Sequence, residues 1–109
     1  MPTKMFLSYR LKPETDVAEF KTWSVEVDMP FTQSLDGVSK FVVYEAEGDD
    51  VQAEGKGPLF FEDIEVESRE KWDEVLGTPA GQEMVATWKA FADESSLVLF
   101  HGPPVAVAA

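Results

Sequence analysis

The stretch Leu59-Phe60-Phe61-Glu62-Asp63-Ile64-Glu65-Val66-Glu67 decides the fold of this chain. A two-residue period places Glu62, Ile64 and Val66 on one face and the remaining three acids on the other, which is typical of a β-strand. Ser68 follows at once and offers an N-cap for a short helix over residues 69–76. The segment therefore predicts a strand that leads directly into a helix.

The same kinds of element lie on either side of this segment. Before it, strand-like runs over residues 5–11 and 38–46 enclose a helix that begins at Asp16. After it, a helix with Pro79 in its first position leads to a last strand over residues 96–101. Two β-α-β units predict an α+β, ferredoxin-like domain. Its four-stranded antiparallel sheet should carry its helices on one face only.

Three further features indicate where the first helix, the central connection and the domain begin and end. Pro30 should interrupt the first helix, because proline lacks an N–H group and crowds the preceding turn. Residues 47–58 are rich in glycine and acidic side chains, and we expect this connection to be mobile. Nothing in the composition divides the chain, so we expect one domain over residues 1–109. Its core should span about 4–102, followed by an apolar tail over 103–109.

The composition limits the classes of partner and cofactor that we expect. The chain has 21 acidic and 9 basic side chains, a formal net charge of -12. This charge repels phosphate backbones and anionic membrane surfaces, so neither nucleic acid nor a membrane is an expected partner. The absence of cysteine excludes disulfides and thiolate metal sites, and it fits a cytoplasmic protein. With a single histidine and no nucleotide-binding glycine pattern, we expect no metal and no organic cofactor.

The sheet face without helices should be apolar and bare. Alternation puts apolar residues on that face in at least three strands. An exposed apolar sheet face requires a partner, so the pattern predicts a homodimer that forms by packing sheet on sheet.

Several segments resemble, in this order, the dimeric α/β-barrel superfamily and more narrowly its REDY-like (HapK-like) branch. They are residues 5–10, 23–30, 38–45, 61–66 and the helix around Phe91. The resemblance covers roughly residues 4–102. It implies a ferredoxin-like protomer whose sheet packs on that of a second chain, with a flat organic ligand held between sheet and helices.

The resemblance also implies a range of activities. Many members of the superfamily are cofactor-free monooxygenases, isomerases or cyclases, and others bind haem. REDY-like members are associated with clusters that make pyrrole and bisindole pigments, where they act on or steer reactive intermediates. Asp28-Met29-Pro30 stands where relatives in the ethyl-ether-degradation group carry a histidine before proline. A mechanism that depends on that histidine is therefore not carried over.

Asp28 and His101 are the candidate catalytic pair. His101 is the only histidine, and its imidazole suits proton transfer near neutral pH. Alternation puts it on the side of Leu97 and Leu99; the alternatives are a surface residue at a strand end and, less favoured, a haem ligand. Asp28 ends the first helix, where a carboxylate is unfavourable for the helix dipole. Burial would raise its pKa toward that of a general base, whereas an exposed Asp28 would be a turn residue.

Six further residues are candidates for binding a planar ligand. Aromatic side chains at the seam between sheet and helices can stack on such a ligand, although core packing alone also explains them. One of the two adjacent acids on the third strand should face a cavity or a buried arginine, with Arg10 or Lys40 as the possible partner; the alternative is a structural ion pair or an edge charge. These candidates are Tyr9, Trp23, Tyr44, Trp88, Glu62 and Asp63.

Three functions remain open. The favoured one is a cofactor-independent enzyme that acts on or steers a reactive, flat, indole- or pyrrole-derived intermediate in specialised metabolism. The enzyme would orient this intermediate and assist its ring closure, coupling or proton shift by acid/base catalysis. The alternatives are a non-catalytic protein that binds or channels such an intermediate, and a cofactor-free monooxygenase.

Overall fold

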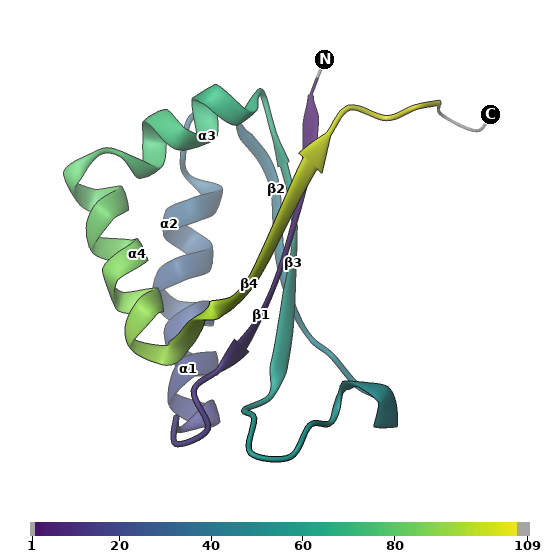
Figure 1. Cartoon of the computed structure of the whole chain (residues 1–109). Coiled ribbons are helices and arrows are strands. Elements are labelled where there is room, and N and C mark those ends of the chain that lie inside the picture. Colours follow the sequence, from purple (N-terminus) through teal and green to yellow (C-terminus); the bar gives the residue numbers. More distant parts are fainter. Residues whose placement is uncertain (1, 107–109) are drawn as a thin grey trace.

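The computed structural model describes residues 2–106, apart from the side chain of Asp50; residues 107–109 of the predicted tail lie outside the described residues. The strands β1 (Thr3–Leu11), β2 (Val38–Glu45), β3 (Leu59–Val66) and β4 (Ala92–Gly102) form one sheet in the order β2-β3-β1-β4. All three pairings are antiparallel. Figure 1 shows the sheet edge-on, with every long helix to one side. The predicted α+β, ferredoxin-like protomer is confirmed.

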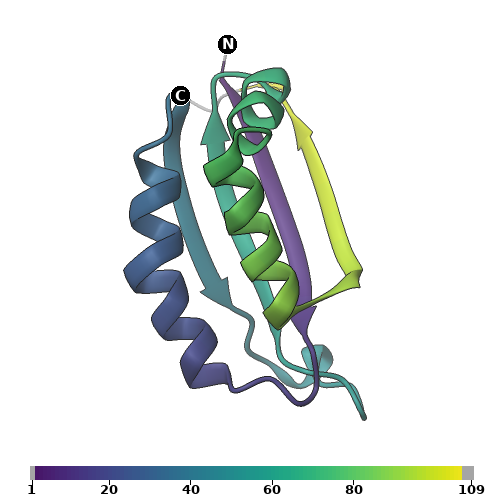
Figure 2. The same cartoon turned by 90° about the vertical axis from the view of Figure 1, so that its left-hand side faces the viewer.

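The helices form a layer over one face of the sheet (Figure 2). The first half of the chain contributes one continuous helix, which consists of α1 (Val17–Trp23), the π-turn η1 (Ser24–Asp28) and α2 (Met29–Gln33). The second half contributes α3 (Arg69–Leu76) and α4 (Pro79–Phe91). Within residues 2–106, no helix is long and apolar enough to cross a membrane.

Side-chain caps begin these helices, and those at Asp16 and Ser68 lie where the sequence predicts helix starts. Asp16 accepts a hydrogen bond from the Glu19 N–H, and Ser68 accepts one from the Lys71 N–H. Thr78 caps α4 through the Gly81 N–H at 3.1 Å. These side chains satisfy N–H groups that a helix leaves without an internal partner.

The prediction that Pro30 interrupts the first helix is wrong. The chain continues from Val17 to Gln33 because the turn before the proline widens. There the Met29 N–H bonds to the Ser24 carbonyl, five residues earlier instead of four. Proline cannot donate this kind of bond, and its ring collides with a carbonyl of a regular preceding turn. A π-turn is a known way for a helix to absorb such a defect and continue.

The connection over residues 46–58 is anchored to the first strand. It contains the short turn η2 (Asp49–Val51). The Arg10 guanidinium donates to the carbonyls of Val51 at 2.8 Å and Gly57 at 3.1 Å. Gly57 passes so close to the backbone of Leu11 that a Cβ atom would lie 2.0 Å from the Leu11 carbonyl oxygen. Only glycine permits this approach.

The core lies between the sheet and the helices, in two clusters. One surrounds the C-terminal ends of β1 and α4, and the other surrounds the opposite end of the sheet. Burying each of these large side chains contributes about 1.5–3 kcal/mol, so the helix layer is firmly attached. The first cluster comprises Tyr9, Leu11, Phe20, Phe60 and Ala92, and the second Met5, Phe41, Ile64, Val66 and Trp72.

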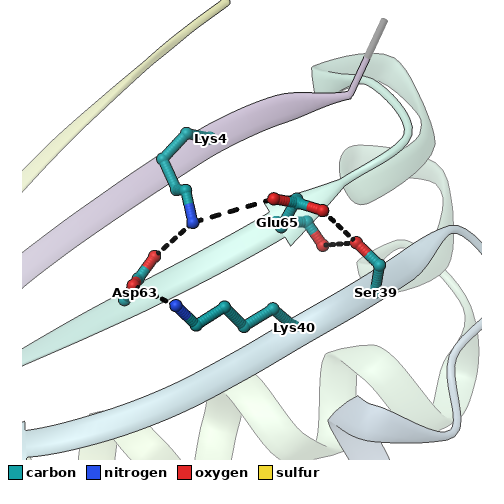
Figure 3. Close-up of polar contacts among 5 residues, drawn as sticks. All are labelled: Lys4, Ser39, Lys40, Asp63 and Glu65. Atoms are coloured by element: carbon teal, nitrogen blue, oxygen red, sulfur yellow. Dashed lines mark hydrogen bonds and ion pairs between the residues drawn. The ribbon is translucent and has the colours of Figure 1, made fainter. Parts of the chain in front are cut away.

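The open sheet face is mixed in character, and the prediction of an apolar face is correct only in part. Aromatic pairs do lie on it: Phe6 stacks on Phe100 at 5.7 Å, and Tyr44 stacks on Phe61 at 4.9 Å between ring centroids. Between β1 and β2, however, Asp63 forms ion pairs with Lys4 and Lys40 at 3.0 and 2.9 Å (Figure 3). Charged groups therefore occupy the middle of this face.

Candidate functional site

A cavity of about 220 Å³ lies between the sheet and the helix layer. Every one of the four strands and each long helix contributes to its wall, which is mainly apolar and aromatic. Such a cavity suits a small, flat, largely apolar ligand. The apolar lining residues are Leu7, Trp23, Phe31, Phe41, Trp72, Leu76, Met84, Val85, Trp88, Leu97 and Leu99. The polar ones are Asp28, Thr32, Glu62, Arg69 and Asp73.

Glu62 is the most deeply buried acid of this cavity. It lies on β3 between Phe60 and Ile64, and it is 5% exposed. The Tyr9 hydroxyl donates to Glu62 Oε2 at 2.5 Å. Burial raises the pKa of Glu62 to about 8; the Tyr9 hydrogen bond lowers this pKa and the charge of Asp28 raises it further. At neutral pH the Glu62 carboxyl therefore holds its proton.

Asp28 enters the same cavity from the helix layer. It is the last residue of the π-turn, and the Thr32 hydroxyl donates to Asp28 Oδ1 at 3.1 Å. Burial raises the pKa of Asp28 to about 6, while the bond from Thr32 opposes that rise. At pH 7 Asp28 is therefore mostly ionised, whereas Glu62 is mostly protonated. Two carboxyl groups with separated pKa values can serve as base and acid in one site.

An ion pair lies at the edge of the cavity. Arg69 Nε is 3.0 Å from Asp73 Oδ1, one turn along α3. Arg69 is the only basic residue among the cavity-lining residues, and its charge is matched by this partner. Across residues 2–106, no group of three or more histidine, cysteine, aspartate or glutamate side chains is arranged to hold a metal ion.

Asp28 and His101 are not brought together. His101 pairs with Met5 in the β1–β4 ladder, which puts it on the helix-bearing side, as alternation predicts. It is nevertheless exposed at the end of β4, and it lines a separate hollow with Phe6, Phe100 and the start of the C-terminal tail. The catalytic assignment of His101 stays a prediction; the described cavity contains Asp28 and not His101.

The six predicted ligand-binding residues fall into two groups. Trp23, Trp88 and Glu62 line the cavity. Tyr9 is completely buried behind Glu62, with the edge of Trp88 against its ring at 5.0 Å, so it does not reach the cavity space.

Tyr44 and Asp63 lie outside the cavity, on the open face. Of the two adjacent acids, Glu62 faces the cavity and Asp63 pairs with Lys40, one of the two partners expected. Alternation separates two neighbouring acids in this way because successive side chains on a strand point to opposite faces.

Sequence reasoning missed several cavity residues. Thr32 lies four residues after Asp28, which is the spacing of helical neighbours, but the expected break at Pro30 concealed it. Trp72, whose place on a short helix indicates a rim or packing residue, is 7% exposed and belongs to both the core and the cavity wall. Arg69 and Asp73 have the i,i+4 spacing of an ion pair on α3. No sequence pattern indicated that this pair lies at the edge of a cavity.

Comparisons with solved structures show the fold. HapK from Hahella chejuensis is 22% identical with a TM-score of 0.73, covering 100% of this chain and 99% of that chain. An ethyl tert-butyl ether d (ethd) family protein from Bacillus halodurans C-125 is 19% identical, with a TM-score of 0.65 and coverage of 96% and 100%. SnoaB, a cofactor-independent oxygenase from Streptomyces nogalater, is 8% identical, with a TM-score of 0.70 and coverage of 97% and 95%.

Sequence comparison gives the family. A search of the curated proteins found no match. Residues 3–101 match the family described as REDY-like protein HapK, which is nearly the whole chain. This chain therefore belongs to the REDY-like HapK family.

Proposed function

We propose that this chain is a cofactor-independent enzyme that binds a reactive, flat aromatic intermediate in the helix–sheet cavity and assists its reaction by proton transfer. The observation that carries the proposal is the presence of two interior carboxyl groups, Asp28 and Glu62, in a mainly apolar and aromatic cavity. Burial separates their pKa values around neutrality, to about 6 and about 8. Membership of the REDY-like HapK family supports an indole- or pyrrole-derived intermediate of specialised metabolism.

The chemistry follows from the two protonation states. Ionised Asp28 accepts a proton from the bound intermediate, and protonated Glu62 donates one elsewhere on the same molecule. Together they assist a ring closure, a coupling or a proton shift, each of which moves a proton between two positions. General acid and base groups of this kind typically contribute about 10²–10⁴-fold in rate, and orientation in a fitted cavity adds to that.

The functional unit that we propose is a homodimer formed through the open sheet face. Phe6, Phe100, Phe61 and Tyr44 expose aromatic surface there, and a second copy would cover it. The helix layer is on the opposite side of the sheet (Figure 1). The cavity lies under that layer, so each protomer would keep its own site.

A cofactor-free oxygenase is the second candidate. It is favoured by the structural similarity to SnoaB, which is described as a cofactor-independent oxygenase. In that reaction Asp28 would remove a proton and the resulting carbanion would react with oxygen. Incorporation of label from ¹⁸O₂ into the product distinguishes this candidate from a cyclisation or coupling.

The test is turnover of a panel of bisindole and pyrrole precursors by the wild type and three variants. Asp28→Asn and Glu62→Gln should each lower turnover at saturating substrate about 10²–10⁴-fold, with the fold retained. His101→Gln should leave turnover unchanged if the cavity is the whole site. An equal loss in His101→Gln extends the site to the strand end. Binding without turnover in the wild type supports a binding or channelling protein instead.

A further inference from the structure

We propose that the molecule held in the helix–sheet cavity is an organic cation, and that the site selects a positively charged flat ligand over neutral or anionic molecules of the same shape. This inference rests on the proposed function and names its substrate class: a protonated or alkylated nitrogen heteroaromatic, or an iminium ion conjugated with a ring.

The first support is the aromatic wall. The chain has three tryptophans, and all three line this one cavity. They come from three different helices: Trp23 from α1, Trp72 from α3 and Trp88 from α4. Phe31 and Phe41 add further rings. Aromatic rings attract cations through the negative charge of their faces, and several rings around one space form a cation-binding cage.

The second support is the balance of charge within the wall. Asp28 and Glu62 are two acids from opposite layers, and the hydrogen bonds from Thr32 and Tyr9 engage one oxygen of each. The lining residues include one basic side chain, Arg69, and Asp73 already neutralises it at the cavity edge. Among the lining residues, ionised Asp28 therefore has no free counter-charge, and a bound cation would provide it.

The energetics disfavour neutral and anionic ligands. A neutral ligand would displace water from Asp28 and leave a carboxylate in an apolar space, which is unfavourable. An anion would add a second negative charge beside the first. A cation instead compensates Asp28, because an opposite charge nearby stabilises the charged form of an acid. Near pH 6, where Asp28 is partly protonated, binding of a cation should therefore release protons.

All titratable groups that face this space enter the pH dependence. Asp28 and Glu62 border it directly, Tyr9 lies behind Glu62, and Arg69 and Asp73 stand at its edge. The cavity-lining residues of α4 and β4 are uncharged. Because Asp28 titrates near pH 6, the affinity for a cation should fall as the pH is lowered from about 7.5 to about 5.

Three probes with the same ring system test the inference: 1-methylquinolinium, its neutral counterpart 1-methylnaphthalene, and the anion 1-naphthoate. Binding is measured by tryptophan fluorescence and calorimetry at about pH 7.5 in physiological salt. The cation should bind at least about tenfold more tightly than the neutral probe, and the anion most weakly. Asp28→Asn should remove most of this preference without weakening the neutral probe. Glu26→Gln, an exposed acid on the same π-turn, is the matched control and should retain it.

The outcomes separate the two proposals. Equal binding of the cation and the neutral probe, or a preference that survives Asp28→Asn, overturns the cation inference and leaves the flat-ligand site intact. Loss of the preference in Glu26→Gln as well would attribute it to the overall negative charge, and this also overturns the inference. If none of the three probes binds, both the inference and the proposed function fall.

Discussion

Replacing Glu62 by glutamine should make this protein more stable above pH 7 and remove much of the pH dependence of its stability. Glutamine has the shape of a protonated glutamate and is likewise uncharged, and it keeps an oxygen that accepts a hydrogen bond from the Tyr9 hydroxyl. The substitution therefore locks the side chain in the state that the folded protein prefers at neutral pH.

The magnitude follows from the two pKa values. The pKa of Glu62 rises from its ordinary 4.5 to about 8 on folding. Between these values the unfolded chain loses its proton while the folded chain holds it, so the free energy of unfolding falls as the pH rises. At about 1.36 kcal/mol for each pKa unit, the wild type should lose about 3 kcal/mol between pH 5 and 8 through this group. Asp28, raised from 3.8 to about 6, adds a loss of the same sign at lower pH.

The assay is urea unfolding at pH 5, 6, 7 and 8 with the protein concentration held constant, because a dimer would make stability depend on concentration. Glu62→Gln should show a flatter profile than the wild type and exceed it at pH 8. Glu83→Gln, at an exposed position of α4, serves as control and should follow the wild type. Parallel profiles for Glu62→Gln and the wild type would refute the reasoning, since Glu62 would then not hold a proton in the folded protein.

Three further predictions concern neighbouring parts of the structure. Tyr9→Phe should lower the free energy of unfolding by about 1–3 kcal/mol at pH 8 and raise the pKa of Glu62, because that carboxyl loses its hydrogen bond; urea unfolding over the same pH range checks both. Trp88→Ala should lower the free energy of unfolding by about 3 kcal/mol, because the ring packs against Tyr9. In a variant that retains Trp88 as its single tryptophan, acrylamide should quench the fluorescence weakly; strong quenching contradicts this packing. Phe100→Glu should convert the proposed dimer to monomer in sedimentation velocity at micromolar concentration, whereas Val25→Glu, exposed on the helix layer, should not.

The fold could be predicted almost completely because its local signals agree with one another. The alternation in residues 59–67 indicated both the strand and its two faces, while Asp16, the cap at Ser68 and Pro79 in a first helical position marked where helices begin. The exception was the open face. Alternation shows that Lys4, Lys40 and Asp63 share this face, but the ion pairs among them depend on the strand order β2-β3-β1. Strand order is a property of the whole sheet.

The candidate site was predicted less well, because periodicity gives the direction of a side chain and not its depth. Tyr9 and His101 are both on the face that alternation assigns to them. Tyr9 lies so deep that Glu62 stands between it and the cavity, while His101 lies at the exposed end of its strand, outside the cavity-lining set. Depth depends on where each helix crosses the sheet, and that is decided by tertiary packing.

The error at Pro30 explains why Asp28 could be predicted as a candidate residue while its surroundings could not. If the helix ended before the proline, Asp28 would be an exposed residue of a turn, and burial would not raise its pKa. The widened turn lets the helix continue, so residues after the proline form a further helical turn over the sheet. That turn supplies Thr32, whose hydroxyl binds Asp28, and Phe31, which lines the same cavity. The burial that raises the pKa of Asp28 therefore depends on the continuity of this helix, and the irregularity imposed by Pro30 lies directly beside the group that we propose as the base.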